Sequence, residues 1–212
     1  DAIRHEADTM FAALAKVSPD SEDDRAEIEA VCSRREECLS LIDRLVQDLP
    51  DCTKTRMHGD YHLGQVLVVK DDFHILDFEG EPARSLEARR AKGSPAKDVA
   101  GMLRSFDYAA WSATMRLGEL EKESATRALP DAMAWRDAAC NAFLEAYRAE
   151  MSGVSSWPAD EEDAQRLVHL FLLEKALYEI RYEAANRPAW LGIPVRGLAS
   201  ILDDAAARSG NG

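Results

Sequence analysis

The stretch that decides the fold is MHGDYHLGQV, residues 57–66, which packs two histidines, an aspartate and a glutamine just before a β-branched run. Such a stretch suits three structures: a cluster of metal ligands, the catalytic loop of a phosphotransferase, or an ordinary polar turn between two elements. The residues that follow it distinguish among these.

Two short runs of β-branched or aromatic residues follow, at 65–69 and 73–76, and Lys70-Asp71-Asp72 separates them. This pattern is typical of a β-hairpin. Asp77 comes directly after the second run, 17 positions beyond Asp60. A hairpin would therefore fold Asp77 back beside Asp60.

Phosphoryl transfer needs a carboxylate near the acceptor hydroxyl and hard oxygen ligands for Mg²⁺. Protein kinases supply them with H-R-D-x-x-x-x-N followed by D-F-G. Here His58-Gly-Asp60 precedes Gln65 by the same spacing, and Asp77-Phe-Glu79 follows. Gln65 replaces Asn but ends in the same amide oxygen, so it can still bind Mg²⁺. Gly59 allows a tight turn. The side chain of His62 would project to the same side of the loop as that of Asp60 and could contact a phosphate oxygen.

A zinc site is the competing interpretation of the same residues. His58, Asp60 and His62 would lie on one face of an extended segment and could act as ligands. The other three histidines are scattered along the chain and form no second cluster. The joint pattern with Asp77 therefore favours the phosphotransferase loop.

Composition limits the class of protein. With 212 residues, 46% of them hydrophobic, the chain can form one sizeable core or one lobe of a larger protein. A net charge of −13 disfavours nucleic-acid binding. The four cysteines form no C-x-x-C pair, and no apolar run reaches the roughly 20 residues that span a bilayer. We expect a soluble cytoplasmic protein with no membrane partner.

Most of the chain has a helical pattern. Apolar residues at helical spacing run from Ile3 to Val17, and then from Arg25 to Pro50, where Arg35 is the one misfit in what the pattern predicts to be a single long helix. Ser94-Pro95 predicts another helix start.

Downstream segments near 132–151, 160–185 and 195–208 are also expected to be helical. The predicted class is α+β, mostly α, with one small hairpin. We divide the chain into leading helices (1–49), the loop and hairpin (50–82), and a helical subdomain (94–208).

These motifs carry a family resemblance. The set His58-Gly-Asp-x-His-x-Gly-Gln65 with LDFEGEP at 76–82 resembles the kinase-like phosphotransferases related to aminoglycoside and choline kinases. Three longer segments resemble the bacterial maltokinases, which are often fused to trehalose synthase: DFEGEPARSLEARR at 77–90, DVAGMLRSFDYAA at 98–110, and EKALYEIRYEAANRPAWLGIPVRGL at 174–198.

The resemblance implies ATP-dependent phosphorylation of maltose, or a similar sugar, to maltose 1-phosphate. It makes Asp60 the catalytic base and Gln65 and Asp77 the Mg²⁺ ligands, and it implies ATP and Mg²⁺ as cofactors. It covers the C-terminal lobe of a protein-kinase-like fold, since nothing in 1–49 resembles the β-rich N-terminal nucleotide-binding lobe. We therefore expect that lobe to be missing, the chain alone to be inactive, and a fused or associated trehalose synthase to be a candidate partner.

For the sugar, Lys175, Tyr178 and Tyr182 lie at i, i+3 and i+7 of a predicted helix, and Glu179 is one turn after Lys175. We predict that these four residues, with Glu79 beside the metal, bind the acceptor. Alternatively, Lys175 and Glu179 form a surface ion pair and the tyrosines cap the core. Trp190 is interpreted as a residue of the core.

Two other functions fit the same pattern. One is a kinase for aminoglycosides or another small molecule with a hydroxyl group. The other is a non-catalytic kinase-like module that binds a partner enzyme.

Overall fold

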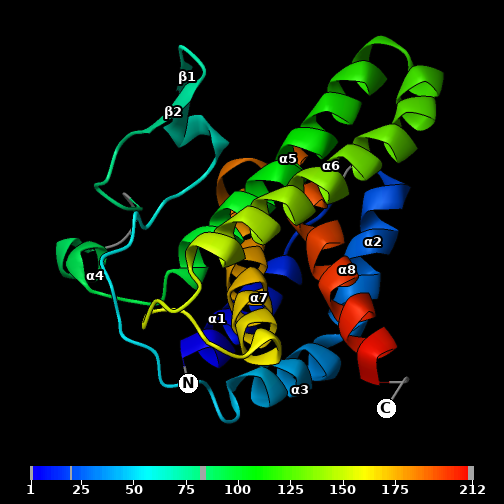
Figure 1. Ribbon diagram of the computed structural model, residues 1–212. Helices are drawn as coiled ribbons and strands as arrows, with labels where there is room; N and C mark the ends of the chain where they lie inside the picture. Colours follow the sequence, from blue (N-terminus) through cyan, green and yellow to red (C-terminus); the bar gives the residue numbers. More distant parts are fainter. Residues whose placement is uncertain (1, 20, 82–84, 210–212) are drawn as a thin grey trace. The chain divides into compact units, whose positions relative to one another are not determined.

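The computed structural model describes residues 2–19, 21–81 and 85–209, and it confirms a mostly helical chain with one small antiparallel sheet. Figure 1 shows the elements in chain order: α1 (Ala2–Leu14), α2 (Glu22–Ser33), α3 (Arg35–Val46), η1 (Leu63–Gln65), β1 (Val66–Val69), β2 (Asp72–Ile75), α4 (Leu86–Arg90), α5 (Ala96–Leu120), α6 (Lys122–Glu150), α7 (Glu161–Asn186), η2 (Pro188–Trp190) and α8 (Gly192–Ser209). None of the helices in these ranges combines the length and apolarity that a membrane crossing requires.

The chain divides into two compact units, Asp1–Leu49 with His169–Gly212, and Pro50–Val168. The first unit is built on one cluster of apolar side chains from α1, α2, α3, α7 and α8, and its largest fully buried members are Met10, Leu14, Ile42, Leu173, Leu177, Ile180, Leu198 and Leu202. These positions recur at helical spacing, so each helix turns one apolar stripe to the core.

The single long helix expected from Arg25 to Pro50 is wrong. The chain forms α2 and α3 instead, and Arg34 between them leaves the helical conformation at φ −94° and ψ 15°. Glu36 and Glu37 lie in the first turn of α3, where acidic side chains stabilise a helix start. Arg34 also donates from Nε to Glu37 at 2.8 Å and from its guanidinium to Asp203 at 2.7 Å, which fixes the break.

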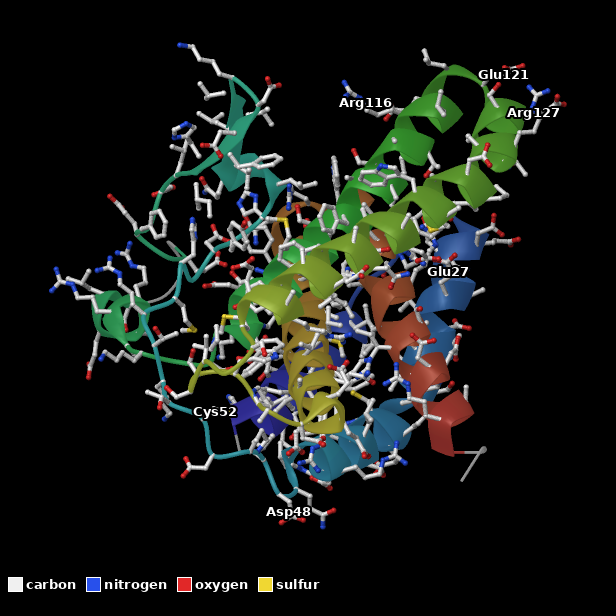
Figure 2. The ribbon with its side chains drawn as sticks, in the orientation of Figure 1. Glu27, Asp48, Cys52, Arg116, Glu121 and Arg127 are labelled. Atoms are coloured by element: carbon white, nitrogen blue, oxygen red, sulfur yellow. The ribbon has the colours of Figure 1, made fainter. Side chains whose placement is uncertain are left out.

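In the second unit, α5 and α6 run side by side as a long antiparallel pair (Figure 1). Figure 2 shows Arg116, Glu121 and Arg127 around the turn that joins them. α6 begins at Lys122, ten positions before the predicted start at 132, because its first turns are polar and include Pro130. The short helix α4 was not predicted.

The predicted hairpin is present as an antiparallel pair of strands. Val66 pairs with Ile75 and Val69 with Asp72, so Lys70 and Asp71 form a two-residue turn. Both turn residues have positive φ, 50° and 64°, as a tight hairpin with right-handed strand twist requires. The predicted strand limits are correct to within one residue.

Candidate functional site

The hairpin brings Gln65 and Asp77 together. Beyond the last strand pair, the Leu76 N–H donates to the Gln65 carbonyl at 2.9 Å. This bond places Asp77 one residue past the partner of Gln65. The Gln65 side-chain Nε2 donates to Asp77 Oδ2 at 3.4 Å.

Asp60 and His62 form a second close pair. His62 Nε2 lies 3.8 Å from Asp60 Oδ2. The other ring nitrogen, Nδ1, accepts the Gly64 N–H at 3.1 Å, so the ring is held with Nε2 toward the carboxylate. The predicted same-side projection of these two side chains is therefore present.

His58 ties the loop to the far end of the hairpin. It is buried, its Nε2 donates to the Leu76 carbonyl at 2.6 Å, and its Nδ1 accepts the Asp60 N–H at 3.3 Å. Its ring also packs against Phe78, with 4.9 Å between ring centroids. The His58 imidazole thus connects the Asp60 N–H to the carbonyl of Leu76, the residue before Asp77.

These bonds occupy both ring nitrogens of His58, which removes it as a zinc ligand in this conformation. Among the residues that the structure describes, no group of three or more His, Cys, Asp or Glu side chains is arranged to hold a metal ion. The zinc-site interpretation therefore finds no support among the described residues.

Asp77 has an unusual backbone. Its φ is +57°, in the left-handed region that residues other than glycine rarely adopt. Such a conformation costs of order 1–3 kcal/mol and persists where the surrounding structure enforces it, often at a functional site. Gly59 (φ +83°) and Gly80 (φ +77°) pack together nearby, and a Cβ on Gly59 would lie 3.2 Å from Gly80 Cα. The predicted tight turn at Gly59 is confirmed.

One face of α5 holds the loop. Asp98 accepts two loop N–H groups, from His58 at 2.7 Å and from Gly59 at 2.9 Å. Ser105 accepts the Leu63 N–H at 2.9 Å. Between them, a Cβ at Gly101 would lie 2.6 Å from the Tyr61 carbonyl oxygen, so only glycine allows this approach.

Sequence reasoning missed this function of α5. It assigned no role to Asp98, Gly101 or Ser105. The available signal was their spacing, since positions i, i+3 and i+7 share a helix face. On this face, Asp98 and Ser105 can accept backbone N–H groups, and Gly101 between them leaves room for another backbone to approach.

Burial raises the pKa of Asp98 above its usual value, although the N–H groups of Gly59 and His58 oppose that shift. The nearby Asp60 carboxylate adds to the increase. Desolvation therefore disfavours the ionised Asp98, and the two charge-assisted hydrogen bonds offset only part of that cost.

Glu79, the fifth predicted residue of this part of the chain, is exposed in the segment after Asp77. It lies two residues after Asp77, and no contact with another described residue fixes its role. Its part in acceptor binding stays a prediction.

The other predicted acceptor residues lie on α7, in the first unit. The rings of Tyr178 and Tyr182 stack at 6.1 Å between centroids, and Lys175 Nζ lies 5.2 Å from the Tyr178 centroid. Glu179 is buried, so an ion pair between its carboxylate and Lys175 would not lie on the surface. Lys175, Tyr178 and Tyr182 thus form one cluster, and the role of these three residues and of Glu179 in sugar binding stays a prediction.

A neighbouring carboxylate was overlooked. Glu183 is 1% exposed and accepts from Arg187 Nε at 2.9 Å. The same guanidinium lies over the rings of Tyr182 and Trp190, at 5.5 Å and 5.4 Å from their centroids. Trp190 is partly exposed rather than a core residue.

Comparison with known proteins gives a consistent set of relatives. No family model matches the chain. It is 28% identical over 148 residues to a glucosamine kinase of Streptacidiphilus jiangxiensis, covering 70% of this chain and 32% of that protein. It is 30% identical over 177 residues to a glucosamine kinase of Mycolicibacterium smegmatis, covering 83% of this chain and 41% of that protein.

Solved structures show the same likeness. A glucosamine kinase crystal structure matches with a TM-score of 0.77 at 23% identity, covering 96% of this chain and 45% of that one. A glucosamine kinase in complex with glucosamine, ADP and inorganic phosphate matches with a TM-score of 0.74 at 23% identity, covering 98% of this chain and 48% of that one. The chain thus has the fold of part of these kinases, and it spans less than half the length of each of these relatives.

Proposed function

We propose that this chain is the C-terminal lobe of an ATP-dependent sugar kinase, and that it supplies the acceptor-side carboxylate and the Mg²⁺ ligands. The observation that carries the proposal is the contact between Gln65 and Asp77 at the open end of the hairpin, which His58 ties to the backbone of Asp60. The curated relatives and the matching structures are kinases, which supports the same reaction class.

The donor set fits a magnesium ion. Mg²⁺ takes hard oxygen ligands, typically one or two carboxylates with the rest from phosphates and water. Asp77 offers a carboxylate, and Gln65, 3.4 Å away, offers an amide whose oxygen faces the same point after a half-turn of its terminal group. When bound, the ion would neutralise charge on the nucleotide phosphates.

The chain's own groups have separate tasks. Asp60 would orient the acceptor hydroxyl and take its proton. His62, with Nε2 toward Asp60 at 3.8 Å, would stabilise the carboxylate or donate to a phosphate oxygen. His58 and Asp98 are positioning residues, since they act on the backbone of the loop and not on the reacting atoms.

The hairpin surface is consistent with a nucleotide-binding lobe packed against it. Val68 and Phe73 face each other across the strands and are 71% and 68% exposed. A pair of strands with large apolar side chains in water normally has a partner. We propose that this partner is the β-rich lobe that occupies the remaining length of the relatives, so that the chain by itself transfers no phosphate.

For the acceptor we propose a hexosamine such as glucosamine. The reported relatives are named glucosamine kinases, and the chain's net charge of −13 suits a cationic substrate. Maltose, with the fused trehalose synthase that the resemblance implied, becomes the second candidate because neither of these relatives is named a maltokinase. An aminoglycoside is the third.

The test uses the longest natural polypeptide that contains this sequence. ADP formation is measured with glucosamine, maltose and an aminoglycoside, each with and without Mg²⁺. Metal-dependent turnover on glucosamine supports the proposal. Turnover on maltose alone would show that the acceptor is maltose and not a hexosamine. Absence of turnover on every hydroxyl acceptor, together with binding of another protein, would replace the kinase with a non-catalytic module.

A further inference from the structure

A pocket of about 400 Å³ lies behind the catalytic loop, within the unit Pro50–Val168. Its walls include His58 and Tyr61 from the loop, Phe78 after the hairpin, and Phe143 and Tyr147 from α6. Its volume is at the lower end of the range for small-molecule sites, about 300–1,000 Å³.

The pocket is separate from the candidate phosphotransfer groups. None of Asp60, His62, Gln65 and Asp77 contributes to its walls. From the loop, His58 and Tyr61 do line the pocket. A ligand here would therefore contact none of these four side chains directly.

The lining favours a flat aromatic ligand. Five of the wall residues named above carry rings, and Ile75, Val99, Met151 and Val154 add aliphatic surface. Aromatic rings prefer offset or edge-to-face contacts with other rings, and such contacts select planar ligands over branched aliphatic ones. Burial raises the pKa of Tyr147 to about 12, so its hydroxyl remains a hydrogen-bond donor at neutral pH.

The guanidinium of Arg56 favours an anionic group on that ligand. Asp98 lies on the wall, but two loop N–H groups already bind its carboxylate. Arg56 also lines the pocket, is exposed, and makes no hydrogen bond or ion pair with any residue in the described ranges. An acidic substituent at the pocket mouth would therefore meet an unpaired positive charge.

We propose that this pocket binds a small planar aromatic carboxylate, with its ring against His58, Phe78 and Tyr147 and its carboxylate on Arg56. The ligand would contact the imidazole that accepts the Asp60 N–H and donates to the Leu76 carbonyl. Occupancy is thus transmitted through His58 to the backbone of Asp60. The binding proposal does not depend on the phosphotransfer reaction.

The test titrates the purified chain with 2-naphthoate and follows backbone amide signals by NMR. We expect saturable shifts at His58, Tyr61 and Val154, and at the Asp60 amide, which is outside the pocket. Arg56→Gln should weaken 2-naphthoate about fivefold, the scale of one exposed ion pair. The same variant should leave the affinity for uncharged 2-naphthamide unchanged.

Two valines with nearly equal exposed fractions provide a variant at the pocket and a control away from its walls. Val154 is 41% exposed at the pocket and Val46 is 42% exposed on α3. Val154→Trp should fill the pocket and abolish the shifts, whereas Val46→Trp should leave them intact. Shifts that survive Val154→Trp, or an absence of saturable binding by both probes, would overturn the proposal.

Discussion

The side-chain amide of Gln65 lies 3.4 Å from the carboxylate of Asp77, twelve positions along the chain, because a two-residue turn reverses the strand between them. The Leu76 N–H to Gln65 carbonyl bond sets the register at the open end of the hairpin. A slip of one residue would turn Gln65 to the opposite face of the strand pair. The proposed metal site therefore depends on strand register as much as on residue identity.

The first prediction concerns Asp60. In the longest polypeptide that contains this sequence, Asp60→Asn should lower kcat by about 10² to 10⁴, the usual contribution of a general base. His62→Gln should lower it less, because His62 acts beside Asp60, and His74→Gln on the exposed hairpin serves as its control. Near-normal turnover of a folded Asp60→Asn variant would remove Asp60 from the mechanism.

The second prediction concerns the contact between α5 and the loop. Gly101→Ala should destabilise the chain by about 1–3 kcal/mol, since the new methyl group would lie 2.6 Å from the Tyr61 carbonyl. Gly118→Ala, in the same helix, meets only Ala125 at 3.5 Å and should stabilise it by up to about 1 kcal/mol. Urea unfolding measures both, and equal effects would contradict the close approach.

The third prediction is a pH dependence at Asp98. Because burial raises its pKa in the folded chain, the folded state keeps the proton to a higher pH than the unfolded state. Asp98's contribution to stability is then greatest below its ordinary pKa, near 3.8, and declines as the pH rises through the raised value. The difference in unfolding free energy between wild type and Asp98→Asn should shrink across that window.

A difference that grows with pH instead would mean that the loop N–H groups lower the pKa of Asp98. The carboxyl ¹³C signal of Asp98 gives an independent check, since its midpoint should lie above the ordinary aspartate value.

The fourth prediction concerns two thiols, the buried Cys38 and the half-buried Cys140. Burial raises the pKa of Cys38 and of Cys140 to about 11. Neither should react with a thiolate-directed reagent at pH 8 in the folded chain, and both should react after unfolding in guanidinium. Rapid labelling of Cys38 without unfolding would contradict its burial at 0% exposure.

The hairpin and the loop were predictable because their signals are local. β-branched runs, a polar turn and fixed spacings within 57–79 determine which side chains meet there. The strand limits are correct to one residue, and the predicted Gln65 and Asp77 are adjacent in the structure. The same local signals gave the positive-φ turn at Gly59.

The hydrogen bonds that Asp98 on α5 accepts from the loop were not predictable in the same way. Asp98 lies 40 positions from His58, and no local pattern specifies which backbone its carboxylate accepts. The break at Arg34 was missed for a related reason, because it depends on Glu37 and on Asp203 far along the chain. Helical periodicity indicates a buried face but not its partner.

The central claim is that Gln65 and Asp77 form one divalent-cation site with Asp60 beside it. The most direct measurement is a titration with Mn²⁺ and ADP, in which paramagnetic broadening of NMR signals locates the ion. The account predicts broadening centred on Gln65 and Asp77. Asp77→Asn should abolish it, and Asp71→Asn, whose residue also has positive φ (64°), should not. Broadening centred elsewhere in the chain, or unchanged by Asp77→Asn, would contradict the site.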